Sequence, residues 1–274
     1  MPVGVRERPK AVFLLKEVRV LAVHGVSKRF GGLWAVRECS LTVAQGSITG
    51  LIGPNGAGKT TLFHLISGFY KPDRGRVEFN GQDITGLPPY RLFHLGLYRT
   101  FQIPRVFPEM TVVENLMLVP AGQAGEKLWN TLLRPRLVQR QEEELRARAG
   151  EILEFTGLSG VATSPAGALS GGQKKLLELA RALMASPKLV LLDEPGAGVN
   201  PTLLKRLAAR IRELALSFGV TVFLIEHDMD LVMGLCDPVI VMSEGRVLAQ
   251  GSPAQVRTDP RVIDAYLGGQ YAVA

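Results

Sequence analysis

The sequence is poor in cysteine and contains no long uninterrupted apolar run. Its two cysteines, Cys39 and Cys236, are isolated and lack the spacing of metal ligands, so a reducing compartment is the simplest inference. No apolar run approaches the ~18 residues that a membrane-spanning helix needs. The apolar run 11–15 is shorter than the ~7–15 residues of a secretory signal, and Lys16 follows it. We therefore expect a cytosolic chain whose residues 1–16 form a flexible N-terminal lead-in.

The sequence also lacks internal repeats and low-complexity linkers. Its 274 residues suit one large α/β domain, or a main domain with a smaller lobe. The net charge of +7 raises the question of a nucleic-acid partner. However, the basic residues are scattered, and the densest cluster, within 134–148, is interrupted by three glutamates at 142–144. A solvated helix face explains this pattern better than a polyanion groove, so no nucleic-acid partner is expected. Proximity to an anionic membrane face is a third alternative that composition does not decide.

The order of the predicted elements indicates an α/β fold. Residues 18–26 alternate like a strand and 40–43 fit its partner, which predicts an antiparallel β portion near the N-terminus. From residue 172 onward, helices alternate with short apolar strands, as in a mostly parallel sheet with flanking helices. Between them the charged helical stretches, broken by Pro135 and Gly157, suggest an inserted helical lobe. The predicted divisions are an α/β core at 17–103 and 168–252, the lobe at 104–167 and a C-terminal helical tail at 253–274.

A glycine-rich loop follows the apolar strand 47–52 and precedes a predicted helix at 61–67. The loop fits the phosphate-binding pattern G-x-x-x-x-G-K-[ST], whose glycines let backbone N–H groups turn toward phosphate oxygens. Lys59 is expected to reach the β- and γ-phosphates of ATP, Thr60 to bind Mg²⁺, and Thr61 to hold the α-phosphate. With this loop, the α/β core is predicted to be a P-loop NTPase. The predicted ATP-binding loop consists of Gly53, Pro54, Asn55, Gly56, Ala57, Gly58, Lys59, Thr60 and Thr61.

Two carboxylates follow the apolar strand 189–192. Asp193 and Glu194 stand at its carboxyl end, which is where α/β sheets bind their ligands. We expect Asp193 to hold Mg²⁺ through water, and Glu194 to be the catalytic base that orients and deprotonates the attacking water.

A second potential anion site lies between these two motifs, at Ser170, Gly171, Gly172 and Gln173. Ser170 fits the N-cap of a helix whose apolar residues recur at helical spacing. Its hydroxyl and the following amides would therefore present another site for phosphate. One chain cannot use two phosphate sites on one nucleotide when one of them is its own loop.

Together with Gln102 and His227, these motifs resemble, in the same order, those of the ATP-binding cassette (ABC) ATPases, and they span nearly the whole chain. The resemblance implies a head-to-tail dimer, in which Ser170–Gln173 of one chain cap the γ-phosphate bound by the other. It also implies that Gln102 senses Mg²⁺ and the γ-phosphate, and that His227 contacts the γ-phosphate. His24, His64 and His94 are expected to be structural.

The same resemblance implies an adenine-stacking role for Phe30, with Val36 as a second apolar contact. A core position for Phe30 is the competing interpretation. One departure concerns the loop after Glu194, where many family members have Ser-x-Leu-Asp but this chain has Asn200 in place of the aspartate. Because the carboxylate is lost, communication across the dimer through this loop is less firmly implied than the nucleotide contacts.

A finer resemblance is to the ATP-binding subunits of bacterial branched-chain amino acid importers. The segments that carry it are 28–33, 99–102, 200–201, 226–233 and 265–268, together with the charged stretch 120–150. It implies a peripheral position on the cytoplasmic face of the membrane, a second ATPase subunit, two permease subunits and, indirectly, an external solute-binding protein.

The same resemblance implies that residues 103–119 pass motion to a permease helix. Pro108, Met110 and Val112 fit either an exposed contact with that helix or packing inside the lobe. The alternative functions are a urea or amide importer, a lipid or polysaccharide exporter, and a non-transport ABC ATPase. A simple P-loop kinase or GTPase would need neither Ser170–Gln173 nor His227.

Overall fold

The computed structural model describes residues 18–271, so the predicted lead-in lies outside the described residues. Its larger sheet has six strands in the order β10-β9-β3-β8-β7-β6. All neighbouring pairs in this sheet are parallel except β10 and β9. Strands β3, β7 and β8 are buried along their whole length, which explains their uninterrupted apolar sequences. The strands are β3 (Ile48–Ile52), β6 (Leu97–Arg99), β7 (Leu189–Asp193), β8 (Thr221–Ile225), β9 (Val239–Ser243) and β10 (Arg246–Gly251).

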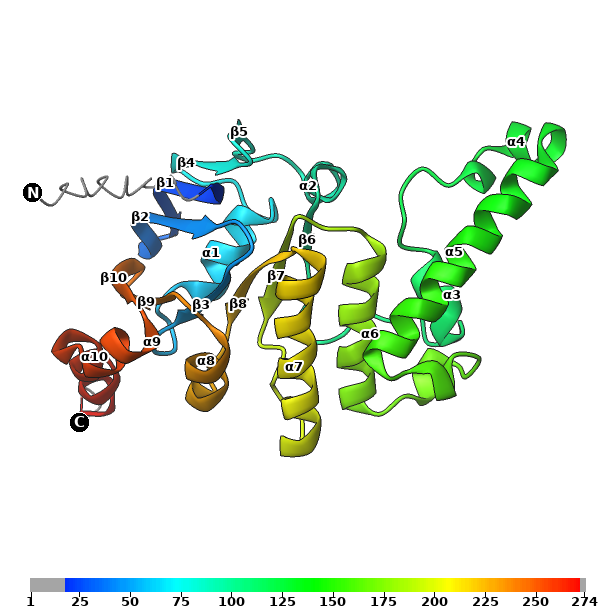
Figure 1. Cartoon of the computed structure of the whole chain (residues 1–274). Coiled ribbons are helices and arrows are strands. Elements are labelled where there is room, and N and C mark those ends of the chain that lie inside the picture. The colour runs from blue at the N-terminus through cyan, green and yellow to red at the C-terminus, as the bar shows by residue number, and fades with distance from the viewer. Residues whose placement is uncertain (1–17, 272–274) are drawn as a thin grey trace, which may run out of the picture.

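A smaller antiparallel sheet, in the order β2-β1-β4-β5, confirms the β portion predicted near the N-terminus. It consists of β1 (Arg19–Phe30), β2 (Leu33–Ala44), β4 (Arg74–Phe79) and β5 (Gln82–Asp83). Helix α1 (Lys59–Ile66) packs between this sheet and the larger one, and its Phe63 lies 5.0 Å from Phe223 of β8, centroid to centroid (Figure 1). This packing holds the amino end of α1 next to the end of β3.

Helices form a lobe at one end of the molecule, away from the small sheet (Figure 1). The lobe includes α3 (Val112–Met117), the short 3₁₀ turn Ala124–Glu126, α4 (Leu128–Leu133) and α5 (Pro135–Thr156). Two further 3₁₀ turns, Ser159–Val161 and Ala166–Ala168, lead to α6 (Gly171–Met184). Gly157 ends α5 with φ 71°, as expected of a helix breaker. Pro135 instead begins α5, because proline in the first turn lacks only an N–H that has no helical partner.

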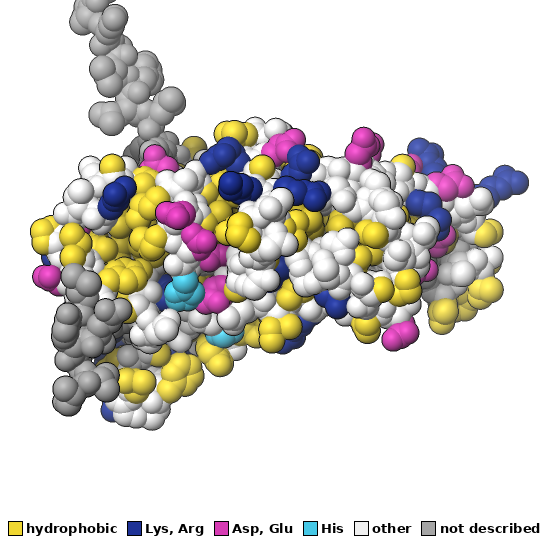
Figure 2. Space-filling model, turned by 90° about the horizontal axis from the view of Figure 1, so that it is seen from below, with side chains coloured by type: hydrophobic (Ala, Val, Ile, Leu, Met, Phe, Trp, Pro, Cys, Tyr) yellow, Lys and Arg dark blue, Asp and Glu magenta, His cyan; other side chains and the backbone are white. Residues whose placement is uncertain are grey.

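The remaining helices flank the two sheets. They are α2 (Pro89–Leu95), α7 (Pro201–Phe218), α8 (Met229–Leu235), α9 (Pro253–Thr258) and α10 (Pro260–Tyr271). Among the described residues, no helix is both long and apolar enough to cross a membrane. On the face seen in Figure 2, basic and acidic side chains are interspersed, and no continuous basic stripe crosses it.

Candidate nucleotide site

The glycine-rich loop connects β3 to α1, as the sequence predicts. Gly53 has φ 147°, and a Cβ there would lie 2.1 Å from the carbonyl oxygen of Met242. Gly58 has φ 96°, and its Cβ would lie 2.2 Å from the carbonyl oxygen of Ala35. Because both obstacles are backbone atoms, only glycine allows the chain to turn so tightly at these positions.

A cavity of ≈ 580 Å³ opens beside this loop, within the range typical of small-molecule sites. The structure brings the predicted residues Glu194 and His227 to its wall, although both come from distant parts of the sequence. Gly53 and Pro54 are not among the lining residues, and the wall also includes Trp34 of β2. The full lining is Leu33, Trp34, Ala35, Asn55, Gly56, Ala57, Gly58, Lys59, Thr60, Thr61, Glu194, His227 and Glu244.

Lys59 is buried at the base of the loop. Its Nζ donates to the carbonyl oxygens of Gly53 at 2.7 Å and of Pro54 at 3.0 Å. Burial lowers the pKa of Lys59, and the nearby carboxylate of Glu194 acts in the opposite direction. The ammonium group is therefore folded back onto its own loop and placed where a polyphosphate would lie.

Glu194 is the point at which three parts of the chain meet. Gln102 donates from Nε2 to Oε2 of Glu194 at 2.7 Å, and Nε2 of His227 lies 2.8 Å from Oε1. Glu194 itself has φ 49°, which is uncommon outside glycine and often marks a functional position. Three residues that the sequence separates widely thus form one hydrogen-bonded group.

Asp193, buried at the end of β7, is paired with a cation that the sequence analysis did not single out. Arg99 donates from Nη2 to Oδ2 of Asp193 at 2.8 Å, and from Nη1 to the hydroxyl of Ser67 at 2.8 Å. The side chains of Arg99 and Asp193 are only 6% and 7% exposed. Burial lowers the pKa of Arg99, whereas the hydrogen bond that Arg99 donates to Asp193 raises it. The sequence offered no local signal for this pair, because the three-residue strand β6 that carries Arg99 was not predicted.

Two further residues that the sequence analysis missed lie on α6. Lys175 donates from Nζ to the carbonyl oxygens of Gln102 at 2.9 Å and of Glu194 at 3.0 Å. Glu178, one turn further, accepts a hydrogen bond from the Phe101 backbone N–H at 2.8 Å. Burial raises the pKa of Glu178 to about 7, against the opposing effect of that hydrogen bond. The other buried side chains of α6 are all apolar, so two charged residues among them are a detectable signal of a polar contact.

Ser170 caps α6, as predicted, and lies outside the cavity. Its hydroxyl accepts from the Gln173 backbone N–H at 3.3 Å, while Gln173 Oε1 accepts from the Ser170 N–H at 2.9 Å. None of Ser170–Gln173 lines the cavity at the phosphate loop. Asn200 likewise caps α7, with its Oδ1 accepting from the Leu203 N–H at 2.9 Å. The substitution of the family's aspartate therefore preserves the capping oxygen.

The apolar residues proposed for adenine do not line this cavity. Val36 is fully buried in the core, and Phe30 is 43% exposed, with its ring edge-on to Tyr70 at 5.3 Å between centroids. Leu33 and Trp34, at the start of β2, line the cavity instead. Adenine contacts at Phe30 and Val36 thus stay a prediction, and Trp34 is a further candidate.

Of the residues predicted to hold magnesium, Thr60 lines the cavity, Gln102 bonds to Glu194 at its wall, and Asp193 is buried and paired with Arg99. The chemistry of their oxygen donors fits this ion. Thr60 offers an exposed hydroxyl, Gln102 an amide oxygen and Asp193 a carboxylate, all hard ligands of the kind that Mg²⁺ prefers. Magnesium usually takes one or two carboxylates together with phosphate oxygens and water. The remaining ligands would therefore come from the nucleotide.

Residues 36–197 match the ABC transporter family, and residues 246–272 match the family described as branched-chain amino acid ATP-binding cassette transporter. The chain therefore belongs to the ABC transporter family and is one of its ATPases. The site and the fold agree with this assignment: a phosphate loop, an acidic strand end and an inserted helical lobe occur in one P-loop NTPase body.

Among its relatives is the Archaeoglobus fulgidus protein named probable branched-chain amino acid transport ATP-binding protein LivG. The two are 44% identical over 253 residues, or 92% of this chain and 97% of the relative. The Pseudomonas aeruginosa protein named high-affinity branched-chain amino acid transport ATP-binding protein BraF is 43% identical over 249 residues, or 91% and 98%. A solved nucleotide-free ATP-binding cassette from an ABC transporter superposes with a TM-score of 0.78 at 40% identity, covering 90% of this chain and 98% of that one.

Proposed function

We propose that this chain is the ATP-hydrolysing subunit of an importer for branched-chain amino acids, acting at the cytoplasmic face of the membrane. The observation that carries the proposal is the contact of Gln102 and His227 with the two carboxylate oxygens of Glu194 beside the phosphate cavity. The names of two relatives that are 43–44% identical refer to branched-chain amino acid transport, which supports this choice of solute.

Each residue of the group has a distinct part in hydrolysis. Lys59 and the loop amides would hold the β- and γ-phosphates, and Glu194 would orient the attacking water and accept its proton. Thr60, Gln102 and Asp193 would hold Mg²⁺, which supplies neutralising charge to the phosphates when bound. His227, which contacts the carboxylate oxygen of Glu194 that Gln102 does not, would contact the γ-phosphate. The short distances among Gln102, Glu194 and His227 support these assignments.

A second chain would complete the site. Ser170 and Gly171 are exposed at the start of α6, outside their own chain's cavity, so they are accessible to a nucleotide held by another subunit. The positive end of the α6 dipole would favour the γ-phosphate there. We therefore propose a head-to-tail dimer, made with a copy or with a second ATPase subunit, that closes on ATP.

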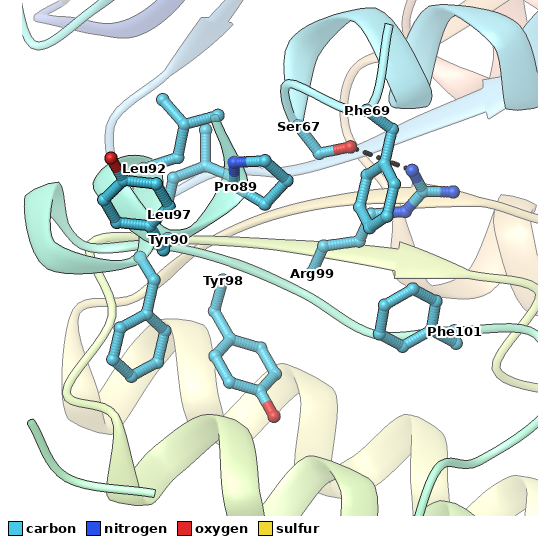
Figure 3. Close-up of a pocket in the computed structure, with 10 residues that line it drawn as sticks. Ser67, Phe69, Pro89, Tyr90, Leu92, Leu97, Tyr98, Arg99 and Phe101 are labelled. Carbon is cyan, nitrogen blue, oxygen red and sulfur yellow. Dashed lines mark hydrogen bonds between the residues drawn. The ribbon is translucent and has the colours of Figure 1, made fainter. Parts of the chain in front are cut away.

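Permease contact is proposed at an apolar pocket of ≈ 290 Å³ between α2, β6 and the segment that follows β6. Figure 3 shows the rings of Tyr98, Phe69 and Phe101 in its wall, with Arg99 between the two phenylalanines. Motion of a permease helix seated there would reach Asp193 through Arg99, and Glu194 through the segment that contains Gln102. Of the lobe residues considered for this contact, Pro108 is exposed, Met110 is partly exposed and Val112 is fully buried. Val112 therefore belongs to the lobe core.

The assignment of Glu194 is tested by Glu194→Gln, with Glu151→Gln, an exposed change on α5, as control. The first variant should retain ATP binding, lose turnover by ~10²–10⁴ and trap the dimer, while the control turns over normally. Unchanged hydrolysis in Glu194→Gln would refute the role of this carboxylate.

The solute is tested in proteoliposomes that contain this chain, its permeases and partner ATPase, with the solute-binding protein outside. ATP-dependent uptake of leucine, isoleucine or valine is expected. Uptake of urea or an amide in place of these amino acids, or outward movement of a lipid, would favour the corresponding alternative function.

A further inference from the structure

Helix α4, at the outer end of the lobe, turns its apolar side to solvent. Leu128, Trp129, Leu132 and Leu133 are 73–81% exposed. Their spacing places them on one side of the helix. A surface helix normally turns this side toward the core of its own protein. A cluster of large exposed apolar side chains on α4 therefore indicates a surface that another partner covers.

Polar contacts fix this unusual orientation. Asn130 donates from Nδ2 to the carbonyl oxygen of Ala124 at 3.0 Å, and the Thr131 hydroxyl donates to that of Gly125 at 3.4 Å. The Ala124 N–H in turn donates to Gln141 Oε1 of α5 at 2.6 Å. The polar side of α4 is thus tied to the lobe, and rotation of the helix to hide its leucines would break these bonds.

Between Glu126 and Glu142, the charged side chains on and next to α4 are all basic. From residue 127 to residue 141 every charged side chain is basic and exposed, and none is acidic. Arg140 forms a surface pair with Glu144 of the next turn. In the described part of the chain, the other cations of this segment have no carboxylate within salt-bridge distance. They are Lys127, Arg134 and Arg136.

We propose that this tip, defined as residues 127–140, docks onto a bilayer that contains anionic phospholipids. Trp129 and the exposed leucines enter the interface between headgroups and acyl chains, and the cations bind the lipid phosphates. A symmetric contact between two copies would instead place like cations against one another. The charge pattern therefore favours a lipid surface over a second copy of this chain.

The docking tip lies far along the lobe from the nucleotide cavity, beyond α3 and at the outer end of α5 (Figure 1). It would add a direct lipid contact to the permease contact, and so limit the freedom of the lobe during ATP-driven closure. Lipid binding can be measured on this chain alone, so its outcome is independent of the transported solute and of ATP turnover.

The first test uses Trp129 as a reporter. The chain has two tryptophans, so Trp34→Phe leaves Trp129 as the only indole. Mixing this variant with vesicles of phosphatidylcholine and phosphatidylglycerol should shift its emission to the blue and allow quenching by brominated acyl chains. Vesicles of phosphatidylcholine alone should bind more weakly, and high salt should weaken binding to the anionic vesicles.

The second test compares two leucines of similar exposure in vesicle cosedimentation. Leu133→Asp, on α4, should weaken binding by roughly tenfold or more, because it removes an inserted side chain and adds an anion. Leu216→Asp, on α7, should bind like the parent, since Leu133 and Leu216 are 74% and 77% exposed. Arg136→Gln should weaken binding to anionic vesicles by roughly fivefold. Circular dichroism establishes that each variant is folded.

Three results would overturn the proposal. One is equal vesicle binding by Leu133→Asp and Leu216→Asp. Another is a blue shift of Trp129 that needs no vesicles and grows with protein concentration, which would identify a second copy as the partner. The third is that the Trp129 indole stays exposed to water when anionic vesicles are added, and becomes buried only in the detergent-solubilised permease complex. That result would assign the tip to the permease.

Discussion

Replacement of Arg99 by methionine tests the buried ion pair between Arg99 and Asp193, the proposed magnesium ligand. Methionine keeps most of the length of the arginine side chain but removes both hydrogen bonds of the guanidinium group, to Asp193 and to Ser67. The Ser67 hydroxyl keeps its own bond to the Phe63 carbonyl oxygen at 2.5 Å. The Asp193 carboxylate, in contrast, loses its paired cation while only 7% exposed.

The cost follows from that burial. Removing one partner of a buried ion pair typically destabilises a protein by about 3–5 kcal/mol, because the remaining charge is left uncompensated. Domains of ordinary stability unfold with only about 5–15 kcal/mol, so the effect should be large in the nucleotide-free protein. Arg140→Met is the matched control: its pair with Glu144 is 80% and 64% exposed, and such surface pairs contribute little.

Urea unfolding followed by circular dichroism provides the measurement, with the free energy extrapolated to water. Adding Asp193→Asn to Arg99→Met should recover part of the lost unfolding free energy, because the buried charge is then gone. The parent, the two single variants and the double variant form a thermodynamic cycle. A loss below about 1 kcal/mol for Arg99→Met, or no recovery in the double variant, would show that the pair is not the source of stability.

Three further changes give distinct outcomes. Gly53→Ala should abolish ATP binding, as measured by equilibrium dialysis, since the new Cβ would lie 2.1 Å from the Met242 carbonyl oxygen. Near-normal affinity would show that the loop can relax. Lys175→Met should lower kcat by at least about tenfold with little change in KM, because Lys175 positions Gln102 and Glu194 without reaching the nucleotide. Burial raises the pKa of Glu178 to about 7 from an ordinary 4.5, so the folded protein holds a proton that the unfolded chain releases. The unfolding free energy should therefore fall by up to about 3 kcal/mol as the pH rises from 4.5 to 7, and Glu178→Gln should remove that part of the pH dependence in urea titrations.

Contiguous motifs could be placed from the sequence because their geometry is local. The phosphate loop, the acidic end of β7 and the Ser170 cap each depend on a short run of residues that fixes its own backbone. The buried strands also follow from short uninterrupted apolar runs, and the long helices from apolar periodicity. Short elements such as α2, β6, α8 and β10 were missed, since seven residues or fewer carry little periodic signal and these four are not continuous apolar runs.

Contacts between distant segments could not be read in the same way. The pair of Arg99 and Asp193 depends on the parallel register of β6 and β7, in which Arg99 lies opposite Leu191. That register is set by packing of the whole sheet rather than by residues near Arg99. Lys175 and Glu178 similarly appear on a helix that the sequence predicts, but their partners at 101, 102 and 194 are known only once α6 is docked.

The position of the lobe and the orientation of the proposed base are physically coupled. Gln102, at the junction of β6 with the lobe, and Lys175, on α6, both bond to Glu194, one at its side chain and the other at its carbonyl oxygen. Gln102 and His227 are also the side chains proposed to contact the γ-phosphate or its magnesium ion. To do so, both side chains would have to give up their bonds to the Glu194 carboxylate and bind the nucleotide instead. The carboxylate oxygens would then be free to accept a hydrogen bond from water. Binding of ATP would thereby release the base and loosen the bond between Gln102 and Glu194 that ties the lobe junction to the sheet, so that catalytic activation and lobe movement arise from the same exchange.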